Sequence, residues 1–237
     1  MGKSLTTTCI VELVGLPGAG KTTVSQQIAL KLQERGLQIV SRDEILKQWH
    51  QENALQKAIK LLPNNFNHWN ILINSLGFAL QVKPINQQSF SKAAKIFTNV
   101  RRNDGVAKLP HSEIILLDQG LLQEIWSVSI TGTPPPTKYL KREIAPLFHN
   151  RPTIILHCQI NIDTALHRVR NRQTMTSRFD LMDLTKAHSL LKKYSFYLDE
   201  IINCAQTCNI PVLKIDSSRS IAEQSQKAVS WIESKLA

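Results

Sequence analysis

The stretch Gly15-Leu16-Pro17-Gly18-Ala19-Gly20-Lys21-Thr22 fits the phosphate-binding pattern G-x-x-x-x-G-K-[ST]. The apolar, β-branched run 8–14 precedes it and predicts a buried strand. Apolar residues that follow it recur at helical spacing, at Val24, Ile28 and Leu32. A glycine loop between a strand and a helix lets backbone N–H groups point at an anion, which the positive helix end also attracts. The sequence therefore predicts a nucleoside triphosphate site.

Each residue of this site has an expected role. Lys21 would reach the β- and γ-phosphates, and the Thr22 hydroxyl would bind Mg²⁺. ATP and Mg²⁺ are therefore the expected cofactors, although nothing in the sequence separates ATP from GTP. The residues expected to surround the nucleotide in this stretch are Gly15, Pro17, Gly18, Ala19, Gly20, Lys21, Thr22 and Thr23.

Length and composition favour a single globular α/β domain over residues 1–237. The 237-residue chain is long enough for a full core, and its 42% hydrophobic content is typical of globular proteins. No apolar run is long enough to cross a membrane, and the first residues do not resemble a secretion signal. The four cysteines lack the spacing of a zinc site, so we expect reduced thiols and a cytoplasmic location.

A formal net charge of +11 leaves two kinds of partner open. It is compatible with nucleic acid, and equally with a polyanionic small molecule bound to a protein with a basic surface. The chain lacks the interleaved aromatic and basic residues of a nucleic-acid module, which favours a small-molecule acceptor. A homodimer also stays open.

The region after the second predicted strand (37–40) holds candidate acceptor residues. Arg42-Asp43-Glu44 follows this strand, and ligands of open parallel sheets bind outside the carboxyl ends of strands. Asp43 could also cap the next helix. Residues from 45 to about 103 read as three helices, so the region 45–110 is predicted to be a helical insertion forming a lid or acceptor pocket. Its candidates for the pocket, or for the core, are Phe66, His68, Trp69, Phe78 and Phe97. Arg101 and Arg102 could contact an acceptor anion or form a solvated helix end.

A third predicted strand, 113–118, ends in Asp118. An apolar run that ends in an acidic residue is the usual form of the second nucleotide-site motif, in which the carboxylate binds the Mg²⁺ shell or the hydroxyl of the phosphate loop. Asp118 and Thr22 are therefore the expected metal ligands. Two further strands, 153–158 and 212–215, complete a predicted sheet of five parallel strands.

An arginine-rich segment follows the fourth strand. Arg168 and Arg172 lie four residues apart on a predicted helix, and the polar stretch that follows adds Arg178. Arginine side chains suit a phosphoryl group whose charge spreads over its oxygens, so we expect a catalytic lid at roughly 172–183. Ser217 lies in the loop after the fifth strand and is expected to contact the nucleotide.

These residues together resemble the P-loop nucleoside and nucleotide kinases, especially the thymidylate-kinase-like branch. The resemblance rests on the phosphate loop, Arg42-Asp43-Glu44, Asp118-Gln119-Gly120 and the segment 165–180, which ends in Arg178-Phe179-Asp180. It implies a three-layer α/β/α P-loop fold and transfer of the γ-phosphoryl group of ATP. Gln119 departs from the family, which has an arginine there for the acceptor phosphate, and this argues against thymidylate itself.

The sequence therefore predicts an ATP-dependent phosphotransferase acting on a nucleotide, a nucleoside or a similar small molecule. A phosphate acceptor needs no general base, whereas a hydroxyl acceptor would pass its proton to a carboxylate, with Asp43 the best-placed candidate. Two alternatives remain: a nucleotide-binding regulatory NTPase, and a kinase for another hydroxyl, including a nucleic-acid end.

Overall fold

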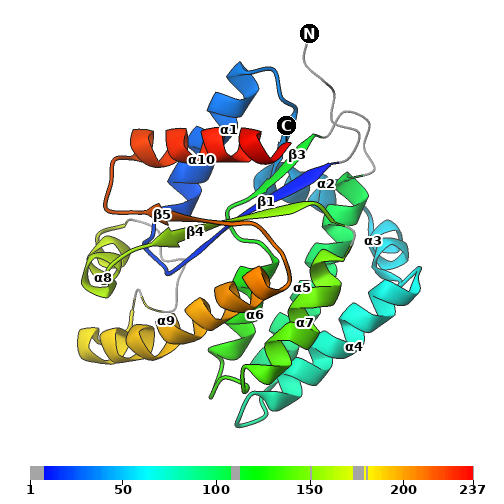
Figure 1. Ribbon diagram of the computed structural model, residues 1–237. Coiled ribbons are helices and arrows are strands. Elements are labelled where there is room, and N and C mark those ends of the chain that lie inside the picture. Colours follow the sequence, from blue (N-terminus) through cyan, green and yellow to red (C-terminus); the bar gives the residue numbers. More distant parts are fainter. Residues whose placement is uncertain (1–7, 108–112, 150, 173–178, 180, 237) are drawn as a thin grey trace.

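Five parallel strands form the centre of the molecule (Figure 1). The computed structural model describes residues 8–107, 113–149, 151–172, 179 and 181–236. The strands lie in the order β2-β3-β1-β4-β5, so the strand before the glycine loop is central. Their bounds are β1 (Cys9–Gly15), β2 (Ile39–Ser41), β3 (Ile114–Leu117), β4 (Thr153–Gln159) and β5 (Val212–Asp216). The predicted five-stranded parallel sheet is confirmed.

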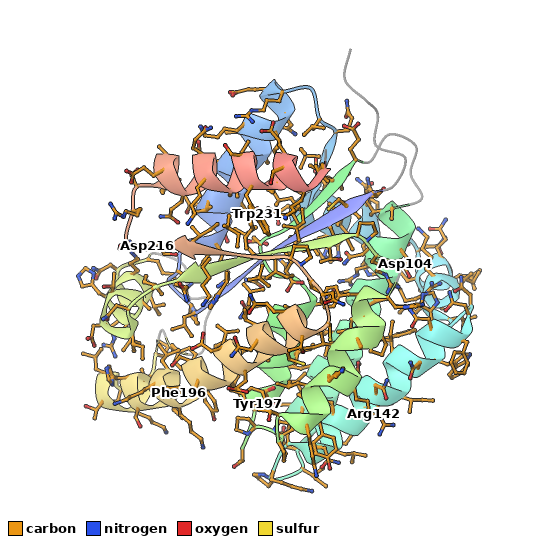
Figure 2. All side chains as sticks on the ribbon, in the orientation of Figure 1. Asp104, Arg142, Phe196, Tyr197, Asp216 and Trp231 are labelled. Carbon is orange, nitrogen blue, oxygen red and sulfur yellow. The ribbon has the colours of Figure 1, made fainter. Side chains whose placement is uncertain are left out.

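Helices cover both faces of the sheet and give three layers (Figure 1). On one face α1 (Lys21–Glu34) and α10 (Ile221–Leu236) pack against Val11 and Leu13 of β1. On the other face α6 (Leu121–Ser129), α7 (Lys138–Phe148), α8 (Ile162–Asn171) and α9 (Leu184–Thr207) share a core with Val14. Figure 2 shows these two layers of side chains, with Trp231 on the α10 side and Tyr197 on the α9 side.

The helical insertion between β2 and β3 is present, but it holds four helices where the sequence suggested three. They are α2 (Arg42–Gln51), α3 (Ala54–Leu61), α4 (Phe66–Gln81) and α5 (Gln87–Val106). The chain breaks between α2 and α3 because Asn53 caps α3: its Oδ1 accepts from the Gln56 N–H at 2.8 Å, and Gln56 Oε1 accepts from the Asn53 N–H at 3.0 Å. We missed this asparagine–glutamine capping box in the sequence.

The aromatic residues of the insertion divide into two groups. His68, Phe78 and Phe97 are buried, as the core interpretation predicts. Phe66 and Trp69, in contrast, are 86% and 52% exposed, so the core interpretation of these two residues is wrong. Both lie on the face of α4 that points away from the rest of the molecule, which the sequence pattern could not separate from the inner face because both faces are apolar.

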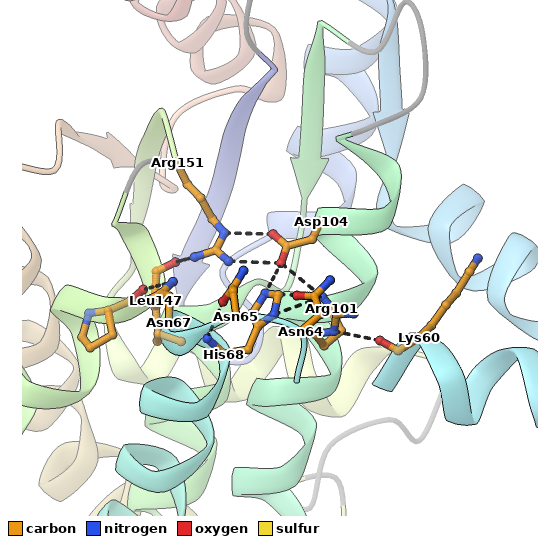
Figure 3. Close-up of polar contacts among 10 residues, drawn as sticks. Lys60, Asn64, Asn65, Asn67, His68, Arg101, Asp104, Leu147 and Arg151 are labelled. Atoms are coloured by element: carbon orange, nitrogen blue, oxygen red, sulfur yellow. Dashed lines mark hydrogen bonds and ion pairs between the residues drawn. The ribbon is translucent and has the colours of Figure 1, made fainter. Parts of the chain in front are cut away.

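A polar network around Asp104 fastens the insertion to the segment before β4 (Figure 3). The Asp104 carboxylate contacts His68 Nε2 at 2.7 Å and accepts from Arg151 Nε at 3.0 Å. Arg101 joins it by donating from Nε to the Lys60 carbonyl at 2.7 Å. Burial is the main cause of a lowered pKa of His68. Arg101, a candidate for an acceptor anion, is thus engaged in holding α3, α4 and α5 together.

Candidate functional site

The glycine loop between β1 and α1 has a backbone that only glycine adopts without strain. Gly18 and Gly20 have φ angles of 83° and 76°, and the Ala19 N–H donates to the Leu16 carbonyl at 3.1 Å to close the turn. A Cβ at Gly18 would lie 2.3 Å from the carbonyl oxygen of Ala165, because the loop packs directly on α8. The loop thus turns directly into the start of α1, as the sequence pattern of an anion site predicts.

Lys21, the first residue of α1, folds back over the loop. Its Nζ donates to the carbonyl oxygens of Gly15 at 2.8 Å and Leu16 at 3.0 Å. Burial lowers the pKa of Lys21 to about 8, and the positive charge of Arg172 contributes to the lowering, while Asp118 opposes it. Lys21, Asp118 and Arg172 are therefore close enough to influence one another, although they come from three separate parts of the chain.

Thr22 and Asp118 meet at the mouth of the loop. The Thr22 hydroxyl donates to Asp118 Oδ2 at 2.6 Å, joining the start of α1 to the end of β3. A hydroxyl and a carboxylate are hard oxygen donors of the kind that Mg²⁺ prefers. Among the described residues no group of three or more His, Cys, Asp or Glu could hold a metal ion. Mg²⁺ is commonly bound by one or two protein oxygens together with substrate phosphates and water, so Thr22 and Asp118 could form the protein's part of such a site.

The acidic residues after β2 have different environments. Glu44 belongs to a capping box with Ser41: its Oε2 accepts from the Ser41 N–H at 2.7 Å. Asp43 is exposed and has no hydrogen bond or ion pair within the described part of the chain. It lines a cavity of about 430 Å³ together with Thr22, Arg42 and Asp118. Among the described residues, Asp43 is thus a carboxylate beside the loop with no hydrogen bond or ion pair of its own, and Glu44 is a helix cap.

Two arginines, Arg42 and Arg102, lie near each other and near Asp118, which Gln119 follows in the sequence; Gln119 is itself exposed. Arg42 Nη1 is 4.0 Å from Asp118 Oδ1, at the limit of an ion pair. Arg102 lies with its guanidinium 4.6 Å above the centroid of the Trp49 ring. Burial, followed by the charge of Arg42, lowers the pKa of Arg102. The two cations are therefore near neighbours, although α2 and α5 carry them separately.

The other predicted residues lie around α8 and the loop after β5. Arg168 Nη2 donates to the backbone carbonyl of Ser217 at 3.1 Å, which brings these two candidates together. Ser217 is fully buried, and its Oγ has no hydrogen-bond partner among the described residues. Arg172 ends α8 as its C-cap residue. Arg178 lies outside the described residues, as does most of the predicted lid at 172–183, whereas Phe179 is buried in the core.

Glu12 is a residue that our sequence analysis missed. It is a fully buried carboxylate in the middle of β1, and its Oε1 accepts from the N–H groups of Leu122 at 2.7 Å and Gln123 at 3.2 Å. Gln123 Oε1 in turn accepts from the Gly15 N–H at 3.2 Å. Burial raises the pKa of Glu12 to about 8. The sequence did hold a signal for this link between α6 and the glycine loop, because Glu12 is the one charged residue of an otherwise apolar strand.

His157 of β4 is a buried histidine outside the site that Thr22 and Asp118 form. It is 5% exposed, and burial lowers its pKa to about 4, so the ring is neutral near pH 7. Its Nε2 lies 4.0 Å from Asp199 Oδ1, and both residues line a cavity of about 440 Å³. This cavity lies between β4, α8 and α9, away from Asp118.

Comparison with known proteins adds little beyond the fold. The sequence matches no family model and no curated protein. Among solved structures it is similar to a deoxyadenosine kinase from M. mycoides with bound dATP, with a TM-score of 0.49 and 15% identity over 94% of this chain and 98% of that chain. A likeness at this level carries no conclusion about substrate or about the thymidylate-kinase-like branch.

Proposed function

We propose that this protein is an ATP-dependent phosphotransferase that acts on a small-molecule acceptor. The observation that carries the proposal is the 2.6 Å contact between Thr22 and Asp118 at the mouth of the glycine loop. Two motif halves separated by 96 residues meet there as a phosphate-loop site requires. The lone loop motif would support nucleotide binding, whereas the joined site, with arginines nearby, supports phosphoryl transfer.

Each residue of the joined site has a proposed role. The loop N–H groups and Lys21 hold the β- and γ-phosphates, while Thr22 and Asp118 hold Mg²⁺. When bound, Mg²⁺ neutralises charge on the phosphate oxygens. Arg172 is close enough to influence Lys21, and Arg168 contacts the loop after β5; both would stabilise the charge that spreads over the transferred group, with Arg178 as a third candidate. ATP is the proposed donor because the site fits a triphosphate.

The acceptor is proposed to be a nucleoside, a nucleotide or a similar small molecule. Asp43 lines the same cavity as Thr22 and Asp118, so a hydroxyl group bound there would lie near a free carboxylate. Gln119 provides no charge for an acceptor phosphate. If the acceptor carries a phosphate, Arg42 and Arg102 are the proposed cations that bind it. The two acceptor types thus depend on different residues.

The experiment that tests the proposal incubates the protein with γ-labelled ATP, Mg²⁺ and separate panels of nucleosides, nucleoside monophosphates and small alcohols. We expect transfer of label to a member of one panel. Lys21→Ala should abolish transfer and keep the circular dichroism spectrum unchanged, whereas Lys235→Ala, which removes an exposed lysine of α10, should retain full activity. Full activity of the Lys21 variant would refute the assignment.

The same experiment separates the alternatives. Hydrolysis of ATP that is slow and independent of every acceptor would favour a regulatory NTPase. Transfer to the end of an oligonucleotide, with binding that weakens steeply as salt increases, would favour a kinase for nucleic-acid ends, which the charge of +11 keeps as a second candidate.

A further inference from the structure

A cavity of about 610 Å³ lies at the amino ends of β4 and β5, where the last turn of α10 also borders it. Cys9, the first residue of β1, lines this cavity, whereas Gly15, the last residue of the same strand, begins the glycine loop. Seven residues of strand span about 20 Å. In Figure 1 the cavity lies toward the end of α10 that is marked C. It is therefore distinct from the candidate nucleotide site.

The side chains around this cavity are basic. Lys141 of α7, Lys235 of α10, His149 and Arg151 all line it, and among the described residues of its lining none is acidic. The cavities beside Asp118 and His157, in contrast, each include carboxylates. Positive side chains that gather around a hollow raise the local concentration of anions. The lining therefore favours a negatively charged occupant.

The charge of Arg151 is balanced within the protein. Its Nε and Nη2 donate to the Asp104 carboxylate at 3.0 Å and 3.2 Å. Lys141 and Lys235 are exposed, and within the described part of the chain neither forms an ion pair with a carboxylate. Lys235 Nζ lies 5.8 Å from the centroid of the Trp231 ring on its own helix. Two positive charges are thus available, which matches the charge of about −2 that a phosphate monoester carries near pH 7.

The floor of the cavity is apolar. It consists of Phe148, Ile154 and Ile210, which are buried, and of Pro152 and Pro211. Apolar walls with a few charged groups are the usual form of a small-molecule site, and the volume lies within the usual range of about 300–1,000 Å³. Inorganic phosphate would leave this floor uncovered. The lining therefore suits a molecule that has an apolar body as well as a phosphate group.

We propose that this cavity binds an organic phosphate monoester, with its phosphate group held by Lys141 and Lys235 and its apolar body on the floor. His149 supplies a further hydrogen-bond donor from the segment after α7. Because α7 and α10 cover opposite faces of the sheet, the bound molecule would join the two helical layers. The inference does not depend on the proposed function, since the cavity and the glycine loop lie at opposite ends of β1.

Calorimetric titration of the full chain with 1-naphthyl phosphate tests the proposal. We expect the double variant Lys141→Ala/Lys235→Ala to raise the dissociation constant by about 100-fold, since each lysine contributes a hydrogen bond to a charged group worth roughly tenfold. Lys186→Ala/Lys193→Ala is the matched control. It removes two exposed lysines of α9 and so lowers the net charge equally, but it should leave the affinity unchanged. Circular dichroism checks that each variant is folded.

A second measurement locates the bound molecule. Cys208 lines the cavity and is partly exposed, so 1-naphthyl phosphate should slow its alkylation by iodoacetamide. Fragment mass spectra identify the alkylated cysteine. In the Lys141→Ala/Lys235→Ala variant the same concentration of 1-naphthyl phosphate should give no protection, whereas protection in the control variant should equal that of the unchanged protein.

Two related molecules separate charge from apolar contact. 1-Naphthol lacks the phosphate and should bind at least about tenfold more weakly, because the charged hydrogen bonds are lost. Inorganic phosphate lacks the apolar body and should also bind at least about tenfold more weakly, because the floor stays uncovered. Three results would each overturn the inference: no binding of 1-naphthyl phosphate at millimolar concentration, an affinity that the Lys141→Ala/Lys235→Ala variant retains, or equal binding of either related molecule.

Discussion

Arg102 stacks above the ring of Trp49 at 4.6 Å, while its neighbour Arg101 donates to the Lys60 carbonyl on the other side of α5. The two arginines are adjacent in the sequence and looked interchangeable as anion ligands. In the structure only Arg102 lies near Arg42, whose guanidinium contacts Asp118. Successive residues of a helix point about 100° apart, so Arg102 lies toward Trp49 and Arg42 of α2, whereas Arg101 fastens the insertion.

Replacing Arg102 should distinguish the two acceptor types. With an acceptor that carries a phosphate, Arg102→Ala should lower kcat/KM by about 10- to 100-fold, the effect of losing a hydrogen bond to a charged group. With an uncharged acceptor, kcat/KM should not change. Arg101→Ala is the matched control and should lower the free energy of unfolding by about 1–3 kcal/mol without a specific effect on the acceptor. Steady-state kinetics and urea unfolding measure the two effects.

Replacing Asp43 tests whether a carboxylate takes the acceptor proton. With a hydroxyl acceptor, Asp43→Asn should lower kcat by about 100- to 10,000-fold, the usual contribution of a general base, while the KM for ATP stays unchanged. Glu44→Gln is the control, since glutamine can replace glutamate in the capping box with Ser41. Equal losses in both variants would show that the helix start matters rather than the Asp43 carboxylate.

Binding of ATP should be coupled to proton uptake by Lys21. Its pKa is lowered to about 8 by burial, so above pH 8 much of the free protein carries a neutral Lys21. Triphosphate binding favours the charged ammonium and should raise this pKa, so complex formation should take up protons between about pH 8 and 10. Calorimetry in buffers of different ionisation enthalpy measures the uptake. Lys21→Met should abolish it, and buffer-independent heats for the unchanged protein would contradict the prediction.

Glu12 should make the protein less stable as the pH rises. Burial raises its pKa from 4.5 to about 8, so the folded state holds the proton more tightly than the unfolded state. The free energy of unfolding should therefore fall between about pH 4.5 and 8, and Glu12→Gln should flatten this dependence. Glu143, whose pKa burial raises to about 7, supplies a similar slope that remains in the variant.

The control for this measurement is Glu34→Gln, because Glu34 is exposed at the end of α1. Urea unfolding at several pH values gives the free energies directly. A Glu12→Gln protein with the same pH dependence as the unchanged chain would show that the Glu12 carboxyl does not hold its proton in the folded state.

The sequence by itself determined the loop, strands and helices, because each of these depends on residues that are close together in the chain. The glycine loop with Lys21 and Thr22, the parallel strands and most helices follow from turn chemistry, apolar periodicity and capping. Asp118 was also singled out from the sequence, as the acidic residue that ends an apolar strand, and its role toward Mg²⁺ stays a prediction. The missed break before α3 was itself a local signal, the capping box at Asn53.

Only the tertiary structure decided which distant residues meet and which faces stay exposed. It joined Thr22 to Asp118 and Arg168 to Ser217, placed Glu12 beneath α6, and separated Arg101 from Arg102. It also left Phe66 and Trp69 of α4 in solvent. Sequence periodicity reports that a residue lies on an apolar face, but burial depends on whether another element covers that face, and this is set by packing across the whole chain.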